Sequence, residues 1–516
     1  MPEPPFCRQE SMKVWVLTLT GLRNDRDAGG PFGVDCWLPG YRPDAFRKLV
    51  RLDNHETQQR RMENGQPAVP LTDNRKPGMD RYAEKSRRVS AWLLISVLLP
   101  AAVAFGLLYR QEFAVPYQDD YPVIVDFAND YSQLHGFTAK LLDIATKQNS
   151  DYKLGFVHFV VAMEMEFAGH LNFPVLVNLG NLSLIAIAYL LWRVYRRDGS
   201  DKNGQLMEFI PISALFFSLT YWESLDWAMA GLQNLPVILF SLLALYLLIS
   251  KPGVSPSPLL LFLSCISAML AAFSSANGFL LAPVGLLMLV RRRNFEASVV
   301  WCASFAVPIA AYLYHYTPSY VSVDTIHRGS YVAKLGYFFA FMGCAIPSRN
   351  AAGLLGLVIS AVLLLALRSR VERTNPVAFY FTLWILLTAG LVAWLRQTIA
   401  SRYSIYSVLL LTFCYWFLFR YVSSRFSAFN QKRFYVASTI LAASFFLMRD
   451  WSAYEHLVQR RQMVLAGMEH YRANPEVNPP TIDPVLAKAF PDEPDRERVT
   501  LNKAIQLNVY TLSPNQ

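Results

Sequence analysis

A long series of apolar segments constrains this chain more than any other feature. Between about residues 90 and 448, stretches with few charges follow one another with short polar breaks. A helix needs about 20 mostly apolar residues to cross the hydrocarbon core of a bilayer. Hydrophobic residues make up 53% of the 516 residues and charged residues only 17%, too few to cover a soluble domain of this length. The sequence therefore predicts an all-α, polytopic membrane protein.

The apolar pattern gives about eleven transmembrane segments. They lie at about residues 91–109, 172–192, 209–221, 232–250, 258–273, 278–290, 297–316, 351–368, 376–394, 403–421 and 432–448. Arginine clusters stand at alternate ends of these segments, around residues 193–197, 291–293 and 368–373, and positive charge favours the cytoplasmic side. These clusters account for the net charge of +10, so we expect a membrane and no nucleic acid as partner.

This topology divides the chain into three parts. Residues 1–85 are polar and are predicted to be a largely disordered cytosolic leader; Met79, before a short basic stretch, is an alternative natural start. Residues 86–448 form the transmembrane domain, and residues 449–516 form a short outer-facing tail. We therefore expect a multi-pass protein of the cell inner (plasma) membrane, with a cytoplasmic N-terminus and an external C-terminus.

Three further apolar segments are predicted to lie along the membrane surface. In the first outer loop, Val123, Phe127, Tyr131, Leu134, Leu141 and Ile144 recur near helical spacing, which is typical of an amphipathic helix. Residues 153–168 carry too many charges for a lipid-facing span. Residues 331–346 contain Lys334 and Gly343 and precede Pro347. The six cysteines have no metal-ligand spacing and are interpreted as structural thiols.

Charged residues near membrane depth are costly and tend to be functional. On the predicted outer side they gather in four places. These are the pair Asp119 and Asp120, the pair Lys153 and His158, the pair Glu223 and Asp226 in the Trp-rich segment 221–234, and the pair Arg396 and Arg402. Acids and bases that converge on one face favour a site over scattered solvation.

Each of these features also has a plain structural interpretation. Asp119 and Asp120 can hold a cation or act as a general base, but Asp is also a good helix N-cap and Pro122 suits a first helical turn. Arg402 can grip a phosphate through its planar fork or reach the interface as a membrane anchor. The segment 221–234 is either a re-entrant wall of a cavity or an aromatic belt.

The arrangement resembles the GT-C class of integral-membrane glycosyltransferases. The resemblance covers about residues 90–448. It lies in an acidic pair early in a long first outer loop, amphipathic helices in that loop, about eleven spans and an outer arginine near the late spans. The motifs that carry it are Gln118-Asp119-Asp120-Tyr121, Trp227-Ala228-Met229-Ala230-Gly231-Leu232-Gln233-Asn234, Ser274-Ser275-Ala276-Asn277-Gly278 and Ser401-Arg402-Tyr403.

The resemblance implies an inverting enzyme that moves a sugar from a polyprenyl-phosphate carrier to an acceptor hydroxyl on the outer face. The acceptor is a lipid, a polysaccharide or a protein. Asp119 or Asp120 would be the base. Adjacent side chains point in different directions, so we expect the two to divide the roles, with Asp120 favoured as the base because it is nearest the start of the surface helix. Arg402, with Arg396 or Lys153, would neutralise the departing phosphate. His158, Glu223, Asp226 and Asn277 would line the cavity. Only some members need a divalent metal, and no third carboxylate motif here requires one.

Two other functions remain open from the sequence. A transporter or flippase of a lipid-linked sugar would use the same aromatic and basic cavity without a base. A non-catalytic membrane assembly factor would need no site at all. A transporter needs access from both faces, whereas the polar groups lie mainly on one predicted side.

The predicted topology can be measured with reporter fusions. Fusions after residues 200, 293 and 372 should read as cytoplasmic and a fusion after residue 516 as external, because the arginine clusters mark the cytoplasmic side. A cytoplasmic reading at residue 516 would contradict the scheme, since it would place Arg402 on the opposite side from the acidic pair.

Overall fold

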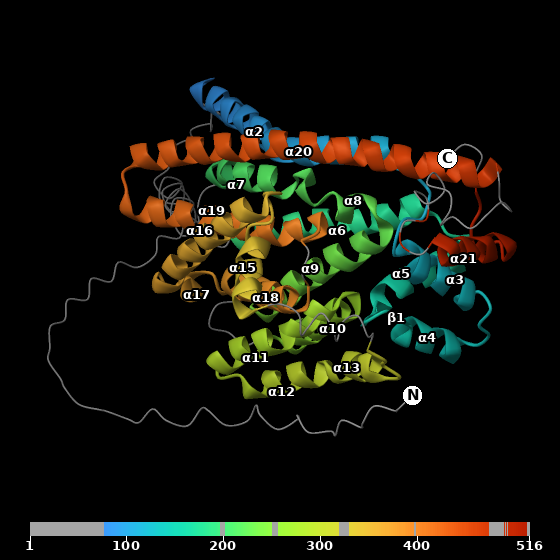
Figure 1. Cartoon of the computed structure of the whole chain (residues 1–516). Helices are drawn as coiled ribbons and strands as arrows, with labels where there is room; N and C mark the ends of the chain where they lie inside the picture. The colour runs from blue at the N-terminus through green and yellow to red at the C-terminus, as the bar shows by residue number, and fades with distance from the viewer. Residues whose placement is uncertain are drawn as a thin grey trace, which may run out of the picture. The chain divides into compact units, whose positions relative to one another are not determined.

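The computed structural model of the chain is almost entirely helical (Figure 1). It describes residues 77–196, 202–249, 256–318, 330–396, 399–473 and 494–512, together with 490 and 492. Most of the leader and its start therefore lie outside the described residues, although the chain is already helical from Pro77. Residues Arg81–Gln516 form one compact unit, to which the description below applies.

The elements follow one another along the chain with short connections. They are α2 (Pro77–Gln111), η1 (Tyr121–Val125), α3 (Asp126–Tyr131), α4 (Phe137–Thr146), β1 (Gln148–Asn149), β2 (Tyr152–Lys153), α5 (Gly155–Ala168), α6 (Phe173–Arg196), α7 (Lys202–Phe216), η2 (Leu219–Tyr221), α8 (Glu223–Asp226), α9 (Ala228–Leu248), α10 (Pro258–Ser274), η3 (Ala276–Leu280), α11 (Leu281–Arg291), α12 (Phe295–Ser304), α13 (Ala306–Leu313), α15 (Tyr331–Met342), α16 (Arg349–Arg368), α17 (Val371–Thr374), α18 (Pro376–Leu395), η4 (Ser401–Tyr403), α19 (Ser404–Arg425), α20 (Ala428–Ala473) and α21 (Pro494–Gln506). The two short strands pair antiparallel, with Gln148 opposite Lys153.

The prediction of an all-α, polytopic membrane protein is confirmed. Among the described residues, seven helices are long and apolar enough to cross a membrane. They are Val89–Gln111, Phe173–Arg196, Ala228–Leu248, Phe295–Leu313, Arg349–Arg368, Pro376–Leu395 and Ser401–Arg425. Three shorter apolar helices, Pro258–Ser274, Ala276–Arg291 and Tyr331–Met342, accompany them. Of the other two predicted spans, 209–221 corresponds to the 15-residue α7, and 432–448 is part of a much longer helix.

That longer helix, α20, has 46 residues and runs along one side of the compact unit (Figure 1). The expected boundary at residue 449 falls inside it. Beyond it, α21 packs on η1 and α3 of the first outer loop. Val464 and Met468 of α20 and Leu501 and Ala504 of α21 belong to the same buried apolar cluster as the loop residue Phe127.

This cluster corrects the expectation for the first outer loop. We expected one amphipathic helix lying on the membrane surface over residues 123–144, but the chain turns after Tyr131 and forms two helices. Val123 and Phe127 are completely buried, because α5, α20 and α21 cover this face. Only α4 keeps exposed apolar side chains, with Phe137 80% and Leu141 52% exposed.

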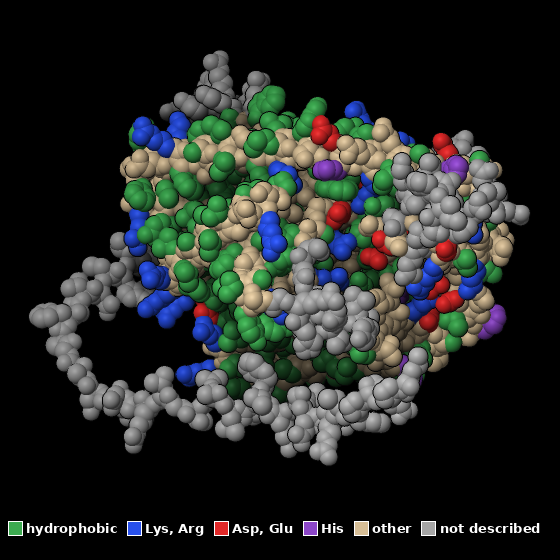
Figure 2. Space-filling view, in the orientation of Figure 1, with side chains coloured by type: hydrophobic (Ala, Val, Ile, Leu, Met, Phe, Trp, Pro, Cys, Tyr) green, Lys and Arg blue, Asp and Glu red, His purple; other side chains and the backbone are tan. Residues whose placement is uncertain are grey.

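Charged side chains are unevenly distributed over the compact unit. In Figure 2, lysines and arginines predominate at the end where α17 lies, and acids and bases mix at the end where α3, α4 and α21 lie. Between the two ends the visible surface is mostly apolar. This pattern agrees with a bilayer around the middle of the bundle.

Close backbone packing fixes the segment before α9. A Cβ atom added at Gly231 would lie 2.8 Å from the carbonyl oxygen of Ser224, and one added at Gly180 would lie 3.0 Å from the carbonyl carbon of Gly231. Small residues let helix backbones approach closely in a membrane. The two glycines therefore hold α6, α8 and α9 together directly beside the Trp-rich segment.

Candidate functional site

The two adjacent aspartates have different surroundings. Asp120 is 2% exposed. Its two carboxylate oxygens accept hydrogen bonds from the backbone N–H of Met229 (2.8 Å) and of Tyr117 (3.1 Å). Burial raises the pKa of Asp120 to about 7, against the pull of the two N–H donors. Asp120 therefore fastens the first outer loop to the start of α9.

Asp119 is half-buried and faces a cavity. Burial raises the pKa of its carboxyl group, and the positive charges of Arg402 and Arg396 oppose the rise. Among the residues that the structure describes, none forms a side-chain hydrogen bond or an ion pair with this carboxylate. The geometry thus agrees with a division of roles between the two aspartates, but it reverses our preference for Asp120 as the base.

Polar side chains from distant parts of the chain meet in the cavity that Asp119 faces, which we call the Asp119–Arg402 cavity. Its free volume is about 130 Å³. They include Asp119, Tyr152, Asn277, Arg396, Arg402 and Tyr403. They come from the first outer loop, β2, η3, the end of α18 and η4. One acid, two cations and several neutral polar groups in a water-accessible recess can bind a phosphate and hold a base beside it.

Two hydrogen bonds to the backbone of Arg402 hold this residue in the cavity. Glu223 accepts a hydrogen bond from the backbone N–H of Arg402 (3.1 Å), and the Ser224 hydroxyl donates to the Arg402 carbonyl (3.3 Å). The guanidinium lies over the rings of Trp227 (5.1 Å) and Tyr403 (5.6 Å). Glu223, predicted as a cavity residue, is therefore a support for Arg402, and the rings leave an edge of the planar cation for a ligand.

Asp226 is also a support. Its carboxylate pairs with Arg460 of α20 at 3.3 Å, and both side chains are almost fully buried. The Arg460 guanidinium also lies over the rings of Tyr117 (4.4 Å) and Trp222 (4.5 Å). This ion pair fastens the Trp-rich segment to α20. The segment is thus a buried structural hub, which agrees with the interpretation as a cavity wall.

Asn277 lies in the cavity wall as predicted from its motif. Its side-chain NH₂ group donates to the hydroxyl of Tyr406 (2.8 Å), and its backbone carbonyl accepts from the indole of Trp384 (3.0 Å). The next residue, Gly278, permits this close packing, because a Cβ atom there would meet the carbonyl oxygen of Ala271 at 2.1 Å.

Lys153 and His158 do not reach the cavity. The Lys153 ammonium donates to the carbonyl oxygens of Ala311 (3.2 Å) and Tyr314, at the C-terminal end of α13. His158 is buried and stacks on Phe127 with ring centroids 4.4 Å apart, and burial lowers its pKa to about 3. A cation near a helix C-terminus stabilises the unpaired carbonyls. Both residues therefore hold the outer loop in place, which contradicts their prediction as phosphate-binding and cavity residues.

A second cavity of about 410 Å³ lies on the other side of Asp119. Asp119 and Tyr152 belong to the walls of both cavities. The wall of this second cavity, which we call the outer cavity, also includes residues of the hairpin and of the tail. The tail contributes the charged residues Asp492, Arg496 and Glu497 together with Thr500. Nothing in the sequence of the tail indicates this contribution, because only the fold brings α21 to the first outer loop.

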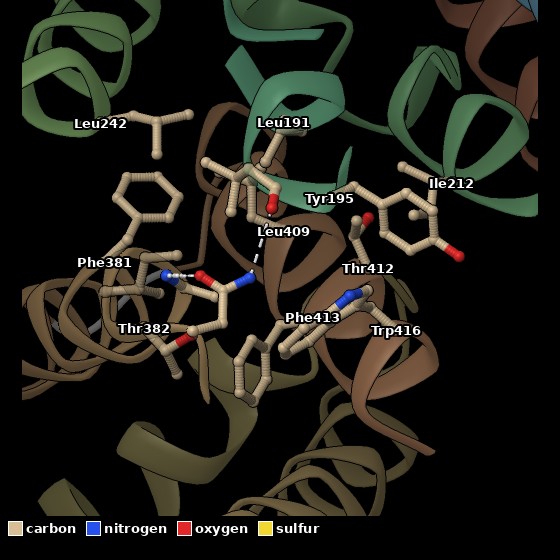
Figure 3. Close-up of a pocket in the computed structure, with 14 residues that line it drawn as sticks. Leu191, Tyr195, Ile212, Leu242, Phe381, Thr382, Leu409, Thr412, Phe413 and Trp416 are labelled. Atoms are coloured by element: carbon tan, nitrogen blue, oxygen red, sulfur yellow. Dashed lines mark hydrogen bonds between the residues drawn. The ribbon is translucent and has the colours of Figure 1, made fainter. Parts of the chain in front are cut away.

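A third cavity, near the arginine-rich ends of the helices, has a different character (Figure 3). Leu191, Leu242, Phe381 and Phe413 line it, and the side chain of Asn375 is engaged by the carbonyl of Val194 and the N–H of Ala378. It offers no charged group. Within the described part of the chain, no three His, Cys, Asp or Glu side chains gather to hold a metal ion.

No protein-family model and no curated protein matches the chain. Among solved structures, the crystal structure of ArnT from Cupriavidus metallidurans bound to undecaprenyl phosphate is similar, with 14% identity over 80% of this chain and 76% of that chain and a TM-score of 0.41. The likeness is distant and identifies no substrate of this chain.

The ion pair between Asp226 and Arg460 gives a testable prediction. Arg460→Leu leaves the Asp226 carboxylate buried without its partner, which should lower the free energy of unfolding by about 3–5 kcal/mol. The matched control is Arg433→Leu on the same helix, whose exposed guanidinium lies over Phe429 and should matter little. Thermal unfolding of the purified variants in detergent measures both, and equal midpoints would contradict a structural role for the pair.

Proposed function

We propose that this protein is an inverting glycosyltransferase of the inner membrane that takes a sugar from a polyprenyl-phosphate carrier. The position of Asp119 carries the proposal. This carboxylate lines two cavities. The cations Arg402 and Arg396 line one of them, the Asp119–Arg402 cavity. A base with a cationic phosphate site on one side and a polar recess on the other is what sugar transfer between two bound substrates requires.

The proposed reaction needs one base and one anion site. The acceptor enters the outer cavity, and the sugar-phosphate end of the donor occupies the Asp119–Arg402 cavity. Asp119 takes the proton of the acceptor hydroxyl as its oxygen bonds to the anomeric carbon. The bond from that carbon to the carrier phosphate breaks on the opposite face, and the electron pair leaves on the phosphate oxygen. Arg402 and Arg396 neutralise the charge that develops there.

Burial suits Asp119 to this role. Its pKa lies above that of an exposed aspartate, so its carboxylate is a stronger base, while the two arginines keep it ionised. Asp120 fixes the loop from behind through the N–H groups of Met229 and Tyr117. The leaving phosphate is already a stable anion and needs no acid, so a single base is sufficient, unlike the two carboxylates of glycoside hydrolysis.

A transporter or flippase of the same lipid-linked sugar fits less well. It would have to receive a phosphate from the cytoplasmic side as well. The cavity nearest the arginine-rich ends is lined by apolar side chains and offers no cation (Figure 3).

Substitutions of the two aspartates test the proposal. In proteoliposomes supplied with radiolabelled undecaprenyl-phosphate sugars, Asp119→Asn should insert normally and lose transfer by about 10²–10⁴-fold, the usual cost of losing a general base. Asp120→Asn keeps one of the two acceptor oxygens. It should therefore lower the midpoint of thermal unfolding, while the rate of sugar transfer stays close to wild type at temperatures where the variant is folded. Asp495→Asn, an exposed position of α21, is the control. Near-normal transfer by Asp119→Asn would refute the assignment of the base.

Arg402→Lys tests the phosphate site. Lysine keeps the positive charge but loses the planar fork and its stacking between Trp227 and Tyr403, so transfer should drop well below wild type. Arg425→Lys, in the last turn of α19, the helix that follows η4, is the matched control. If lysine at position 402 supports wild-type rates, Arg402 is a membrane anchor and not a phosphate ligand.

A further inference from the structure

A separate pocket adjoins η4, the short helix that carries Arg402. It has a free volume of about 390 Å³, and α15, α16, η4 and α20 enclose it. We call it the α15–α20 pocket. Its polar lining includes Tyr337, Arg349, Ser401, Ser404, Arg449 and His456. Neither Arg402 nor Asp119 lines it, so it is distinct from the site described above.

The groups that face this pocket are those that bind anions. Arg349 and Arg449 supply two guanidinium groups, and no carboxylate belongs to the lining. Asp450, the neighbour of Arg449, accepts a hydrogen bond from the backbone N–H of Leu219 (2.7 Å) and stands outside the lining. Arg349 is the first residue of the 20-residue α16, whose N-terminal N–H groups and dipole favour negative charge at the same place.

Several of these groups have no hydrogen-bond partner among the residues that the structure describes. Tyr337 is only 4% exposed, yet its buried hydroxyl has no hydrogen-bond partner among the described residues. The same holds there for the Nε atom of Arg449 and the hydroxyl of Ser401. Leaving a buried polar group unsatisfied costs about 1–3 kcal/mol each. A ligand rich in acceptor oxygens would satisfy all three at once.

We propose that the α15–α20 pocket binds the phosphate group of a membrane lipid. A lipid is favoured over free phosphate because both helices that carry the arginines present exposed apolar side chains close by in sequence. Leu354 of α16 is 66% exposed, and Leu447 and Trp451 of α20 are 68% and 71% exposed. In Figure 2, basic and histidine side chains gather just beneath α20, beside a largely apolar surface. Acyl or prenyl chains would lie along that surface.

The proposal is independent of sugar transfer and is tested by binding. Purified protein is incubated with phosphatidic acid, and retained lipid is measured by native mass spectrometry. Diacylglycerol, which lacks the phosphate, is the ligand control. Wild type should retain phosphatidic acid, and Arg349→Gln with Arg449→Gln should weaken retention by about tenfold or more, because two charge-assisted contacts are lost. Arg368→Gln with Arg433→Gln, at the C-terminal end of α16 and near the N-terminal end of α20, should not.

The outcomes are distinct. Equal retention by the two double variants, or by lipids with and without phosphate, overturns the proposal. Displacement by inorganic phosphate as strong as that by phosphatidic acid overturns the assignment to a lipid. If the Arg349→Gln, Arg449→Gln variant does not fold, photo-crosslinking of wild type with a photoreactive phosphatidic acid locates the lipid instead. It should label the segments 344–352 and 449–456, and labelling confined to 229–234 and 275–277 would place the lipid in the Asp119–Arg402 cavity instead. Because no readout is activity, failure here leaves the transfer proposal standing.

Discussion

The outer half of this protein depends on how one short segment, residues 221–231, is held. The buried ion pair between Asp226 and Arg460 joins it to α20. The N–H of Met229 joins it to Asp120, and Glu223 joins it to the backbone of Arg402. A buried charge is tolerated only when it is paired, so the loss of any one of these contacts would destabilise the segment. The segment thereby places the acid of the first loop and the cation of the late helices in one cavity.

Two neighbouring residues of the same type can thus have unrelated tasks. Successive side chains point in different directions, and the environment of each decides what it does. Asp120 is enclosed and bound by two N–H donors, whereas Asp119 meets only the fields of two arginines across a cavity. Asp120 therefore has a structural role, and the carboxylate of Asp119 is available to a substrate. The electrostatic difference arises from the fold, because the two residues are chemically identical.

The sequence predicted the membrane helices well and the site partly. Length and apolarity decide whether a segment crosses a bilayer, so most predicted spans have a helix at nearly the same residues. The meeting of Asp119, Arg396 and Arg402 also followed from sorting charges by side. Lys153 and His158 were misassigned because their partners, the end of α13 and Phe127, are set by tertiary packing. Arg460 and α21 were missed because the tail is polar, and nothing local in a polar segment records that it folds back onto another loop.

The continuity of α20 has a mechanical consequence. A helix of 46 residues is about 69 Å long at 1.5 Å per residue, more than twice the thickness of a hydrocarbon core of about 30 Å. The same rod carries Arg449 at the α15–α20 pocket and Arg460 at the hub, so it can tilt but cannot bring one residue closer to the other. The eleven residues from Arg449 to Arg460 span about 17 Å along the helix axis. The α15–α20 pocket and the hub are therefore kept at a fixed separation by one continuous element.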